Sequence, residues 1–391
     1  MNNGYVQSLS DNDLYKYSMQ NAVCLTYPKF EVIYELINRD GREFPEGFGK
    51  ELKRIVETFR GLSLSKDGKD FFRKKCYYFS PFYIDFLNGY QYDPNEVVIS
   101  QEGPILSVKI QGYWYRTILW EPPLMATISQ LYFEMTGKDG KFNRQKRKEN
   151  NINKASAFKA MGITAADFGT RRRESFENQD EVVGDLIKYG GGFLIGSSNV
   201  ELAMQYDIIP TGTQAHEWYM FHAALFGFRM ANEIGMERWI NVYEGNLGIA
   251  LPDTFTTDVF LRSFNSKYAR LFDGVRQDSG NPVDFANKII EHYKKLRIDP
   301  LSKLGVFSDN IKSISLVASI HKTCKGRIKD SYGIGTWFSN DTGLKPLNIV
   351  IKLIYVKVES SWIPTVKLSD DPRKNTGDAE TVDLCKQLLR I

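Results

Sequence analysis

The order of hydrophobic and polar residues divides the chain into three stretches with different periodicity. Residues 11–135 mix helical and alternating patterns, whereas residues 155–340 contain short apolar runs separated by longer helical stretches. From residue 347 onward the alternation returns. Because a period near 3.6 is typical of helices and a period of two is typical of half-buried strands, we expect an α/β protein.

In the first stretch the pattern predicts helices at residues 11–23, 51–60 and 124–135 and a strand at residues 30–37. The segments on either side of Gln111-Gly112, residues 105–110 and 113–120, are rich in strand-forming residues. We expect them to form a β-hairpin that ends at the Glu121-Pro-Pro segment.

Seven short apolar runs follow in the middle of the chain, each separated from the next by a helical stretch. They are residues 165–169, 192–196, 207–210, 247–251, 272–275, 304–307 and 331–335. This rhythm predicts parallel strands joined by crossover helices, and seven units indicate an irregular (β/α) barrel.

The end of the chain resembles its beginning. Residues 347–358 and 362–368 have the pattern of antiparallel strands, and we expect them to pack with the N-terminal strands in one α/β layer. The predicted organisation is therefore an N-terminal domain of residues 1–150, a catalytic barrel of residues 151–343, and a C-terminal segment, 344–391, that completes the N-terminal domain.

Composition excludes several classes of protein. The 391 residues are 42% hydrophobic and 25% charged, which is ordinary for a soluble globular protein. The net charge of +4 is too small for a dedicated nucleic-acid binder. No run of about 18 apolar residues is present, and the first ten residues lack an apolar signal core. The four cysteines are far apart and form no CxxC pair, so we expect reduced thiols in a cytoplasmic protein.

Polar segments directly follow each of the seven apolar runs. They are residues 169–173, 196–199, 211–217, 253–254, 276–280, 308–310 and 333–336. In a barrel of parallel strands the active site lies at the carboxyl ends of the strands. Because seven such segments in register are hard to explain by packing alone, we expect them to surround one active site.

Several of these segments have the composition of phosphate sites. Gly333, Gly335 and Thr336 would let backbone N–H groups approach a phosphate closely, with the positive end of the following helix added. Ser308 and Asp309 suit the same task. A tight turn after a strand explains any one of these segments equally well.

Charged side chains in the same places suggest anion and sugar contacts. Three consecutive arginines, residues 171–173, repel each other unless an anion is present, so we expect Arg171 to bind a carboxylate or phosphate. Arg173 could equally be a solvated residue of a basic loop. Asp278 is placed to accept ribose hydroxyls or to hold a metal-bound water, although an aspartate before Gly280 also suits a turn.

One of the four histidines is a candidate for chemistry. His216 lies in a predicted strand-to-helix loop beside Glu217, where a histidine can be a base, a metal ligand or a phosphate acceptor. No second histidine has metal-ligand spacing, so we predict no metal site built by the protein. A neighbouring carboxylate favours a nucleophilic imidazole.

These segments together resemble the nicotinate phosphoribosyltransferases, and the resemblance covers nearly the whole chain. The most specific are Asp13-Leu-Tyr-Lys-Tyr-Ser-Met-Gln20, Phe168-Gly-Thr-Arg-Arg-Arg173, Gly196-Ser-Ser-Asn-Val200, Gly212-Thr-Gln-Ala-His-Glu-Trp218 and Gly274-Val-Arg-Gln-Asp-Ser-Gly280. The resemblance implies a ligase-type enzyme of NAD biosynthesis. Such an enzyme forms nicotinate mononucleotide and pyrophosphate from nicotinate and phosphoribosyl pyrophosphate, coupled to ATP. It also implies a homodimer with a shared active site.

The resemblance assigns the pyridine site to four residues. Tyr15 and Phe168 match the two aromatic rings that sandwich the pyridine, with Tyr15 contributed by the partner chain; plain core packing is the alternative for Tyr15. Arg276 matches the arginine that binds the carboxylate, with Arg171 nearby. Ser198 stands where nicotinamide-using relatives carry an aspartate. An aspartate about 4 Å from the nicotinate carboxylate would cost roughly 4 kcal/mol, whereas a serine hydroxyl donates a hydrogen bond.

The resemblance also assigns the phosphate chemistry. His216 matches the histidine that ATP phosphorylates, and Asp278 matches the ribose contact. Arg39, Lys367 and Lys374 match phosphate and pyrophosphate binders, and Mg²⁺ would bridge the pyrophosphate oxygens. One departure is Asn281, where acid-using relatives often have aspartate; we give Ser198 more weight.

Three other interpretations remain open from the sequence. The pyridine substrate could be nicotinamide or quinolinate, and the chain could be an inactive relative that binds nucleotides or a partner protein. The polar stretch 138–154, which we expect to be a loop or the exposed start of a helix, could bind RNA, but it lacks interleaved aromatic residues.

Overall fold

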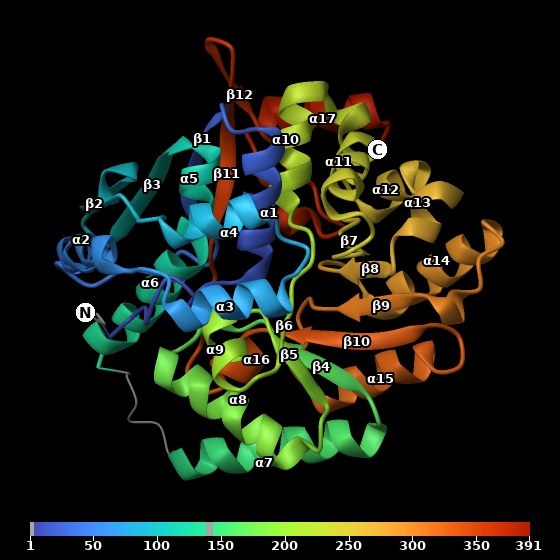
Figure 1. The fold of residues 1–391 in the computed structure, drawn as a ribbon, viewed down its shortest axis with the longest axis horizontal. Helices are drawn as coiled ribbons and strands as arrows, with labels where there is room; N and C mark the ends of the chain where they lie inside the picture. Colours follow the sequence, from blue (N-terminus) through green and yellow to red (C-terminus); the bar gives the residue numbers. More distant parts are fainter. Residues whose placement is uncertain (1–3, 138–143) are drawn as a thin grey trace. The chain divides into compact units, whose positions relative to one another are not determined.

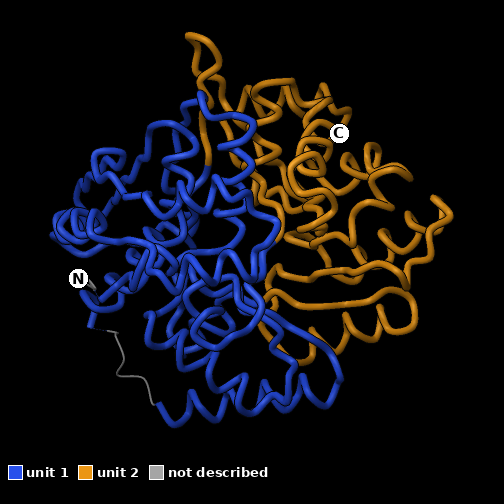
Figure 2. The backbone as a smooth tube through the Cα atoms, in the orientation of Figure 1, with its two compact units in different colours: residues 1–212, 334–352 blue, residues 213–333, 353–391 orange. Residues whose placement is uncertain are grey.

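The computed structural model describes residues 4–137 and 144–391, and the described residues form two compact units (Figure 2). Unit 1 contains the described residues of Met1–Gly212 together with Ile334–Lys352, and unit 2 contains Thr213–Gly333 and Leu353–Ile391. Each unit thus combines segments that are distant in the sequence, so neither can be read as one continuous stretch of chain.

All seven apolar runs in the middle of the chain form strands (Figure 1). The strands are β4 Thr164–Asp167, β5 Leu194–Ser197, β6 Ile209–Pro210, β7 Ile249–Ala250, β8 Gly274–Gln277, β9 Leu304–Phe307 and β10 Lys329–Ile334. They are ordered β6-β5-β4-β10-β9-β8-β7 in one sheet, with parallel pairing between neighbours such as β8 and β9. The expected architecture of parallel strands and crossover helices is confirmed. The predicted barrel is open, because among the described strands β6 and β7 are the ends of this order.

The helices that follow these strands often begin at polar residues that cap them. The longer ones are α8 Phe176–Gly190, α10 His216–Phe226, α11 Phe228–Tyr243, α14 Pro282–Lys295 and α15 Ile314–Cys324. The side chain of Asn281 accepts hydrogen bonds from the N–H groups of Val283 and Asp284 at the start of α14. Asparagine and aspartate cap helices equally well, so Asn281 has a structural role that does not by itself indicate an amide substrate.

A second, antiparallel sheet combines both ends of the chain, as expected. Its strands are β1 Glu31–Asn38, β2 Val97–Glu102, β3 Ile105–Tyr113, β11 Ile349–Val358 and β12 Ser361–Pro364, in the order β12-β11-β1-β3-β2. The helices of the N-terminal stretch are α1 Leu14–Thr26, α2 Phe48–Glu57, α3 Lys66–Lys75, α4 Pro81–Asn88 and α6 Glu121–Met135.

The predicted hairpin at Gln111-Gly112 is wrong. β3 runs through both residues and pairs with β2, whereas the chain after it forms α5 Trp114–Thr117 and the 3₁₀ turn Ile118–Trp120. Large side chains in this segment, including Trp114, Ile118 and Trp120, are fully buried. We predicted a strand because the segment is rich in residues that favour strands, although its buried residues have helical spacing. The Pro-Pro pair then starts α6 rather than ending a strand, because proline is favoured at the first turn of a helix.

The charged stretch before the barrel is largely helical. Residues 138–143 lie outside the described residues, and the remainder belongs to α7 Arg144–Met161, which packs beside α8 in unit 1 (Figure 1). Lys154 within α7 is not solvated: its ammonium is buried and donates to the Asp341 carboxylate and to the carbonyl of Trp337, both at 2.6 Å.

Two further features of the described residues are the character of their helices and the state of their cysteines. No helix among residues 4–137 and 144–391 has the length and apolar character needed to cross a bilayer. The four cysteines are all free thiols, and Cys76, Cys324 and Cys385 are buried.

Candidate active site

The predicted site residues belong to both units. Unit 1 contains Tyr15, Arg39, Phe168, Arg171, Ser198, Gly335 and Thr336, and unit 2 contains His216, Arg276, Asp278, Ser308, Asp309, Gly333, Lys367 and Lys374. Several of the predicted residues of unit 2 are in direct contact, and in unit 1 Tyr15 contacts Arg171.

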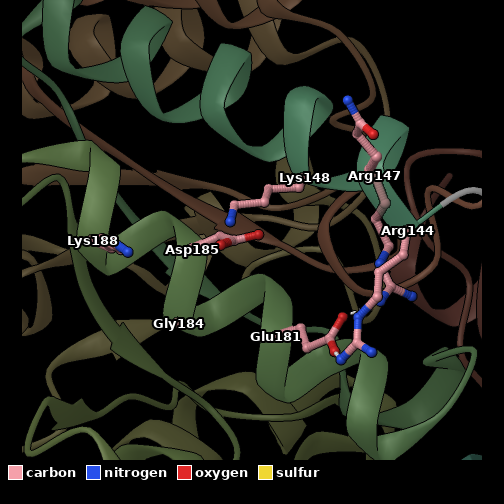
Figure 3. Close-up of a pocket in the computed structure, with 8 residues that line it drawn as sticks. Arg144, Arg147, Lys148, Glu181, Gly184, Asp185 and Lys188 are labelled. Atoms are coloured by element: carbon pink, nitrogen blue, oxygen red, sulfur yellow. Dashed lines mark hydrogen bonds and ion pairs between the residues drawn. The ribbon is translucent and has the colours of Figure 1, made fainter.

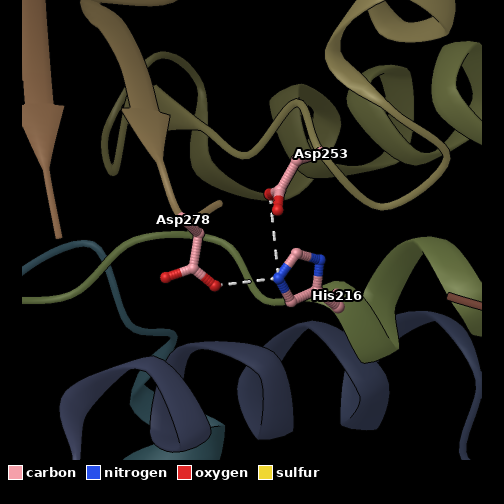
Figure 4. A group of neighbouring side chains, drawn as sticks. All are labelled: His216, Asp253 and Asp278. Atoms are coloured by element: carbon pink, nitrogen blue, oxygen red, sulfur yellow. Dashed lines mark hydrogen bonds and ion pairs between the residues drawn. The ribbon is translucent and has the colours of Figure 1, made fainter. Parts of the chain in front are cut away.

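In unit 2 the cluster is centred on His216, the first residue of α10 (Figure 4). Its Nε2 atom lies 2.9 Å from Oδ2 of Asp278 and 3.8 Å from Oδ1 of Asp253. Its Nδ1 atom lies 3.1 Å from the Thr254 hydroxyl. Asp253 and Thr254 follow β7 and Asp278 follows β8, so adjacent parallel strands deliver these side chains to the imidazole.

The hydrogen bonds fix the protonation of this imidazole. Burial would raise the pKa of Asp278, but Arg276, His216 and Lys367 hold it well below its ordinary value, so the carboxylate is ionised. An ionised carboxylate can only accept, and Nε2 of His216 therefore carries the proton. Burial, together with Lys367, lowers the pKa of His216 to about 4 against the opposing effect of the aspartates. At neutral pH the ring is uncharged, and its lone pair is on Nδ1, where the Thr254 hydroxyl donates.

The carboxylate that contacts the imidazole is thus not the one expected from the sequence. Glu217 follows His216 directly and is buried, yet the ring nitrogen hydrogen-bonds to Asp278. Residues 216 and 278 are brought together by the sheet, which adjacency along the chain does not reveal.

The predicted phosphate-binding residues of unit 2 gather around Asp278. The Ser308 hydroxyl lies 3.2 Å from Oδ1 of Asp278, and Nη2 of Arg276 lies 3.5 Å from Oδ2. The Lys374 ammonium donates to the backbone carbonyl of Asp278 at 3.3 Å and pairs with the Asp309 carboxylate. Lys367 is buried and lies 4.0 Å from Oδ2 of Asp253. Three cationic side chains therefore surround the two aspartates.

Two buried polar atoms in this cluster have no hydrogen-bond partner among the described residues. They are Nε of Arg276 and Oδ1 of Asp253. An unsatisfied buried donor or acceptor costs roughly 1–3 kcal/mol, so both are suited to a ligand. His216, Asp253 and Asp278 also offer ligand atoms within 4.8 Å of one another. This candidate cation site was not predicted, because its members are far apart in the sequence.

In unit 1, Tyr15 and Arg171 lie together, and Asp13 connects Arg171 to Ser198. The Tyr15 hydroxyl donates to the Glu121 carboxylate at 3.1 Å, and the Arg171 guanidinium lies 5.5 Å from the centre of the Tyr15 ring. Arg171 is 3.5 Å from Oε1 of Glu121 and 3.8 Å from Oδ2 of Asp13. The cluster thus combines an aromatic ring, a partly exposed guanidinium and two buried carboxyl groups.

The hydroxyl of Ser198 already has an acceptor in this cluster. It donates to Oδ1 of Asp13 at 2.7 Å. A carboxylate bound here would compete with Asp13 for that proton. Burial raises the pKa of Asp13, although Arg171 and Ser198 act in the opposite direction. The charge that a substrate meets beside Ser198 therefore depends on Asp13, which has no role in the predicted site.

Phe168 stands at the end of β4, half-buried, on a rigid loop. Its N–H donates to the Ile334 carbonyl at 2.8 Å. The preceding residue, Asp167, is buried and accepts from Gly169 N–H and from the Ser197 hydroxyl. A side chain at position 169 would overlap Ser339, so only glycine fits the close approach of these two segments. These contacts fix the backbone that presents the Phe168 ring.

Arg173 is not a solvated loop residue. It is fully buried, and its guanidinium forms a two-point pair with Asp11 at 2.7 and 2.8 Å and donates to the Tyr5 carbonyl. The Asn199 side chain donates to the same aspartate. Arg173 therefore ties the loop after β4 to the N-terminal segment.

The remaining predicted phosphate residues lie at the ends of strands. Gly333 is within β10, and Thr336 begins α16 Thr336–Ser339, whose four residues give it only a small dipole. A Cβ atom on Gly335 would lie 3.2 Å from the carbonyl oxygen of Phe168, so close packing also explains this glycine. Arg39 follows β1, and its N–H donates to the Asn348 carbonyl at 3.0 Å.

A groove of about 510 Å³ between α7 and α8 contains none of the predicted site residues (Figure 3). Its charged lining residues are Arg144, Arg147, Lys148, Glu181, Asp185 and Lys188. Both arginines pair with Glu181, so acids from α8 partly neutralise the basic stretch. This pairing does not favour an RNA-binding surface, which needs an uncompensated basic face.

Sequence reasoning gave no individual role to Asp13, Glu121, Asp253 or Thr254, each of which contacts a predicted site residue. Asp253 and Thr254 follow a predicted strand and were recognisable as a polar segment at its end, but nothing identified their partner. Glu121 is separated from Tyr15 by 106 positions. No local pattern could connect them.

Comparison with known proteins gives one family for almost the whole chain. The model of the nicotinate phosphoribosyltransferase (NAPRTase) N-terminal domain matches residues 10–129, and the model of the NAPRTase family matches residues 163–391. The two matches follow each other in sequence order, separated by residues 130–162, and together include every predicted site residue.

Individual relatives are similar over their full length. The nicotinate phosphoribosyltransferase of Chromohalobacter salexigens is 47% identical over 388 residues, covering 99% of both chains. That of Desulforapulum autotrophicum is 48% identical, covering 98% of this chain and 99% of the relative. Among solved structures, the nicotinate phosphoribosyltransferase of Porphyromonas gingivalis has a TM-score of 0.95 and 40% identity, covering 98% of this chain and 99% of that chain.

Proposed function

The chain belongs to the nicotinate phosphoribosyltransferase family, and from this premise we propose the following reaction. Nicotinate and phosphoribosyl pyrophosphate are joined to form nicotinate mononucleotide and pyrophosphate, and the step is coupled to hydrolysis of ATP. The enzyme acts in NAD biosynthesis as a ligase-type phosphoribosyltransferase. The contacts of His216 are the observation that supports our proposal of ATP coupling.

His216 has the features of a phosphate acceptor. Its ring is neutral at pH 7, its lone pair is on Nδ1, and its Nε2–H is held by Asp278 at 2.9 Å. In the proposed step Nδ1 attacks the γ-phosphorus of ATP, the bond from that phosphorus to the bridging oxygen breaks, and ADP leaves. The imidazole then carries positive charge, which the Asp278 carboxylate stabilises without taking the proton.

The phosphorylated sugar is held by the predicted ribose, phosphate and pyrophosphate residues. Asp278 accepts ribose hydroxyls, and Lys367 and Lys374 neutralise the pyrophosphate together with Arg39. The backbone at Gly333, Gly335 and Thr336, with Ser308 and Asp309, receives the 5′-phosphate. Lysine suits phosphate as a compact charge with three donors.

The site has donors that fit Mg²⁺, which prefers oxygen ligands. Asp253 and Asp278 would hold the ion through carboxylate oxygens. Oδ1 of Asp253 is buried and has no hydrogen-bond partner among the described residues. When bound with pyrophosphate, Mg²⁺ neutralises charge on the leaving oxygens.

Nicotinate binds between Tyr15 and Phe168, with its carboxylate on Arg276 and Arg171. Stacking on aromatic faces holds the flat ring and leaves its nitrogen free. The nitrogen lone pair attacks the anomeric carbon, the bond from that carbon to the pyrophosphate oxygen breaks, and the electron pair leaves with pyrophosphate. Hydrolysis of the phosphohistidine completes the cycle.

The coupling is tested with His216→Ala. We expect slow synthesis of nicotinate mononucleotide to survive while stimulation by ATP disappears, and label from γ-³²P-ATP to be absent from the protein. His292→Gln, a change on α14 in the same unit, serves as the control and should keep both properties. Undiminished ATP stimulation in His216→Ala would show that another group accepts the phosphate.

We further propose that the protein is a cytoplasmic homodimer in which Tyr15 serves the site of the neighbouring subunit. The four free thiols suit a reducing compartment. The shared site is what the family resemblance implies, and it makes the dimer necessary for activity.

A further inference from the structure

The Glu121 carboxylate contacts three residues in the cluster around Tyr15: Lys16, Tyr15 itself and Arg171. It lies 2.6 Å from the Lys16 ammonium, accepts from the Tyr15 hydroxyl at 3.1 Å, and lies 3.5 Å from Nη1 of Arg171. All four residues belong to unit 1.

The local sequence explains why a carboxylate stands at this point. Glu121 is the first residue of α6, and Pro122 and Pro123 follow it in the first helical turn. The prolines fix the backbone and have no N–H to offer, so the Glu121 side chain is directed to other partners. Trp120 and Leu124 on either side are fully buried, which anchors the start of the helix.

Two cations keep the buried carboxylate ionised. Burial raises the pKa of Glu121, but Lys16 and Arg171 outweigh it and lower the pKa to about 2. Lys16 is itself completely buried, and its ammonium lies 5.4 Å from the centre of the Tyr15 ring. A fixed negative charge thus holds one cation, Lys16, in the interior and a second, Arg171, at the partly exposed edge.

This arrangement couples two groups of the proposed pyridine site, Arg171 in the chain's own site and Tyr15 in the site of the neighbouring subunit. The Tyr15 hydroxyl fixes the tilt of the ring, and the same carboxylate limits where the Arg171 guanidinium can lie. The guanidinium in turn stays 5.5 Å from the centre of that ring. Without the carboxylate, Tyr15 would lose an acceptor, and Lys16 and Arg171 would lose their opposite charge and repel each other.

We propose that Glu121 is a positioning residue that sets the preference for nicotinate by fixing Tyr15 and Arg171 together. The proposal rests on the proposed function, in which these two residues bind the pyridine. Because Arg171 attracts an anion, loss of its position weakens nicotinate more than the neutral nicotinamide. Binding of phosphoribosyl pyrophosphate, which uses other side chains, is unaffected.

The test compares Glu121→Gln with wild type in steady-state assays. We expect KM for nicotinate to rise about tenfold or more, as loss of a charged hydrogen bond predicts, and the ratio of kcat/KM for nicotinate to that for nicotinamide to fall. KM for phosphoribosyl pyrophosphate should stay within about twofold of wild type, since a change below 0.5 kcal/mol is expected at sites without shared partners.

Glu134→Gln is the matched control. Glu134 lies on the same helix and also accepts a tyrosine hydroxyl, that of Tyr5, without contact to Tyr15 or Arg171. It should leave the pyridine preference unchanged. A Glu121→Gln enzyme with wild-type KM for nicotinate and wild-type preference would overturn the proposal, as would an equal loss for both pyridines.

If Glu121→Gln does not fold, Tyr15→Phe tests whether the contact between Glu121 and Tyr15 affects nicotinate binding. It removes only the hydroxyl that Glu121 accepts and keeps the ring. We expect a several-fold higher KM for nicotinate, corresponding to one lost hydrogen bond; an unchanged KM would contradict the proposal. Failure of the wild-type enzyme to use nicotinate at all would instead contradict the proposed function, so the two failures are distinguishable.

Discussion

Asp13 and Asp278 show how surroundings decide the charge of one residue type. Asp13 is buried and Asp278 is half-buried, and withdrawal from water raises the pKa of a carboxyl group. At Asp278 the cations Arg276 and Lys367, with His216, overcome that effect and the pKa falls. At Asp13 burial prevails over Arg171 and the Ser198 hydroxyl, and the pKa rises. Sequence reasoning identified His216 and Asp278 because each follows an apolar run. It could not find Asp13 or Glu121, whose hydrogen-bond partners Ser198 and Tyr15 are more than 100 positions away.

The preference for an acidic pyridine can be tested at Ser198. Ser198→Asp adds a carboxylate at a position where Oγ is now 2.7 Å from Asp13. We expect kcat/KM for nicotinate to fall by up to about three decades relative to nicotinamide, from roughly 4 kcal/mol of repulsion at 4 Å. Competition between the two pyridines measures this ratio. Ser198→Asn has similar size without charge and should have a much smaller effect; equal effects of the two variants would remove the electrostatic argument.

At the scale of elements, the strands of the parallel sheet were predictable and one segment of the N-terminal stretch was not. The seven strands are short apolar runs, such as β9 Leu304–Phe307, and the polar residues on either side mark their ends in the sequence. Residues 113–120 are rich in aromatic and β-branched residues, which favour strands on composition, but burial of Trp114 and Ile118 on one face makes them helical. The anion site expected in the loop after β4 stays a prediction, whereas the third arginine of that loop is buried because it pairs with Asp11.

The anchoring of that loop predicts a large effect of Arg173→Met. Removing one member of a fully buried pair leaves the Asp11 charge uncompensated, so we expect a loss of about 3–5 kcal/mol in the free energy of unfolding. Urea unfolding followed by tryptophan fluorescence measures the change. Arg172→Met, the adjacent half-buried arginine, should cost much less; a similar loss in both variants would argue against a specific role for the Arg173 pair.

For the whole molecule, two buried histidines of unit 2 link stability to pH. Burial, with Lys367 adding at His216 and Arg238 at His222, lowers the pKa of each from an ordinary 6.5 to about 4. In this range the unfolded chain binds more protons than the folded one, so stability rises with pH. The contribution is complete above pH 6.5 and is lost as the pH falls from 6.5 towards 4.

We therefore expect the urea midpoint to fall between pH 7 and pH 4.5. Each buried histidine contributes on the order of 3 kcal/mol across the full window. His222→Phe keeps an aromatic ring beside Phe226 and removes one titrating group. It should make the pH dependence shallower, and a profile as steep as that of the wild type would show that other groups cause it.

The shared active site can be tested by complementation. Tyr15→Ala and His216→Ala are each expected to lose ATP-stimulated synthesis, but they lie in different units of the chain. If Tyr15 acts in the neighbouring subunit, mixed dimers contain one intact site, and mixing should restore roughly a quarter of wild-type activity. No recovery after verified subunit exchange would place Tyr15 in the site of its own chain.

Identifying the pyridine that the enzyme converts is the most direct test of the proposed function. Purified protein is supplied with phosphoribosyl pyrophosphate, Mg²⁺ and ATP and with nicotinate, nicotinamide or quinolinate, and the mononucleotide and pyrophosphate formed are quantified. We predict that nicotinate gives nicotinate mononucleotide and pyrophosphate in equal amounts at a far higher kcat/KM than either alternative. Preferential conversion of nicotinamide or quinolinate, or no mononucleotide from any of the three, would contradict it.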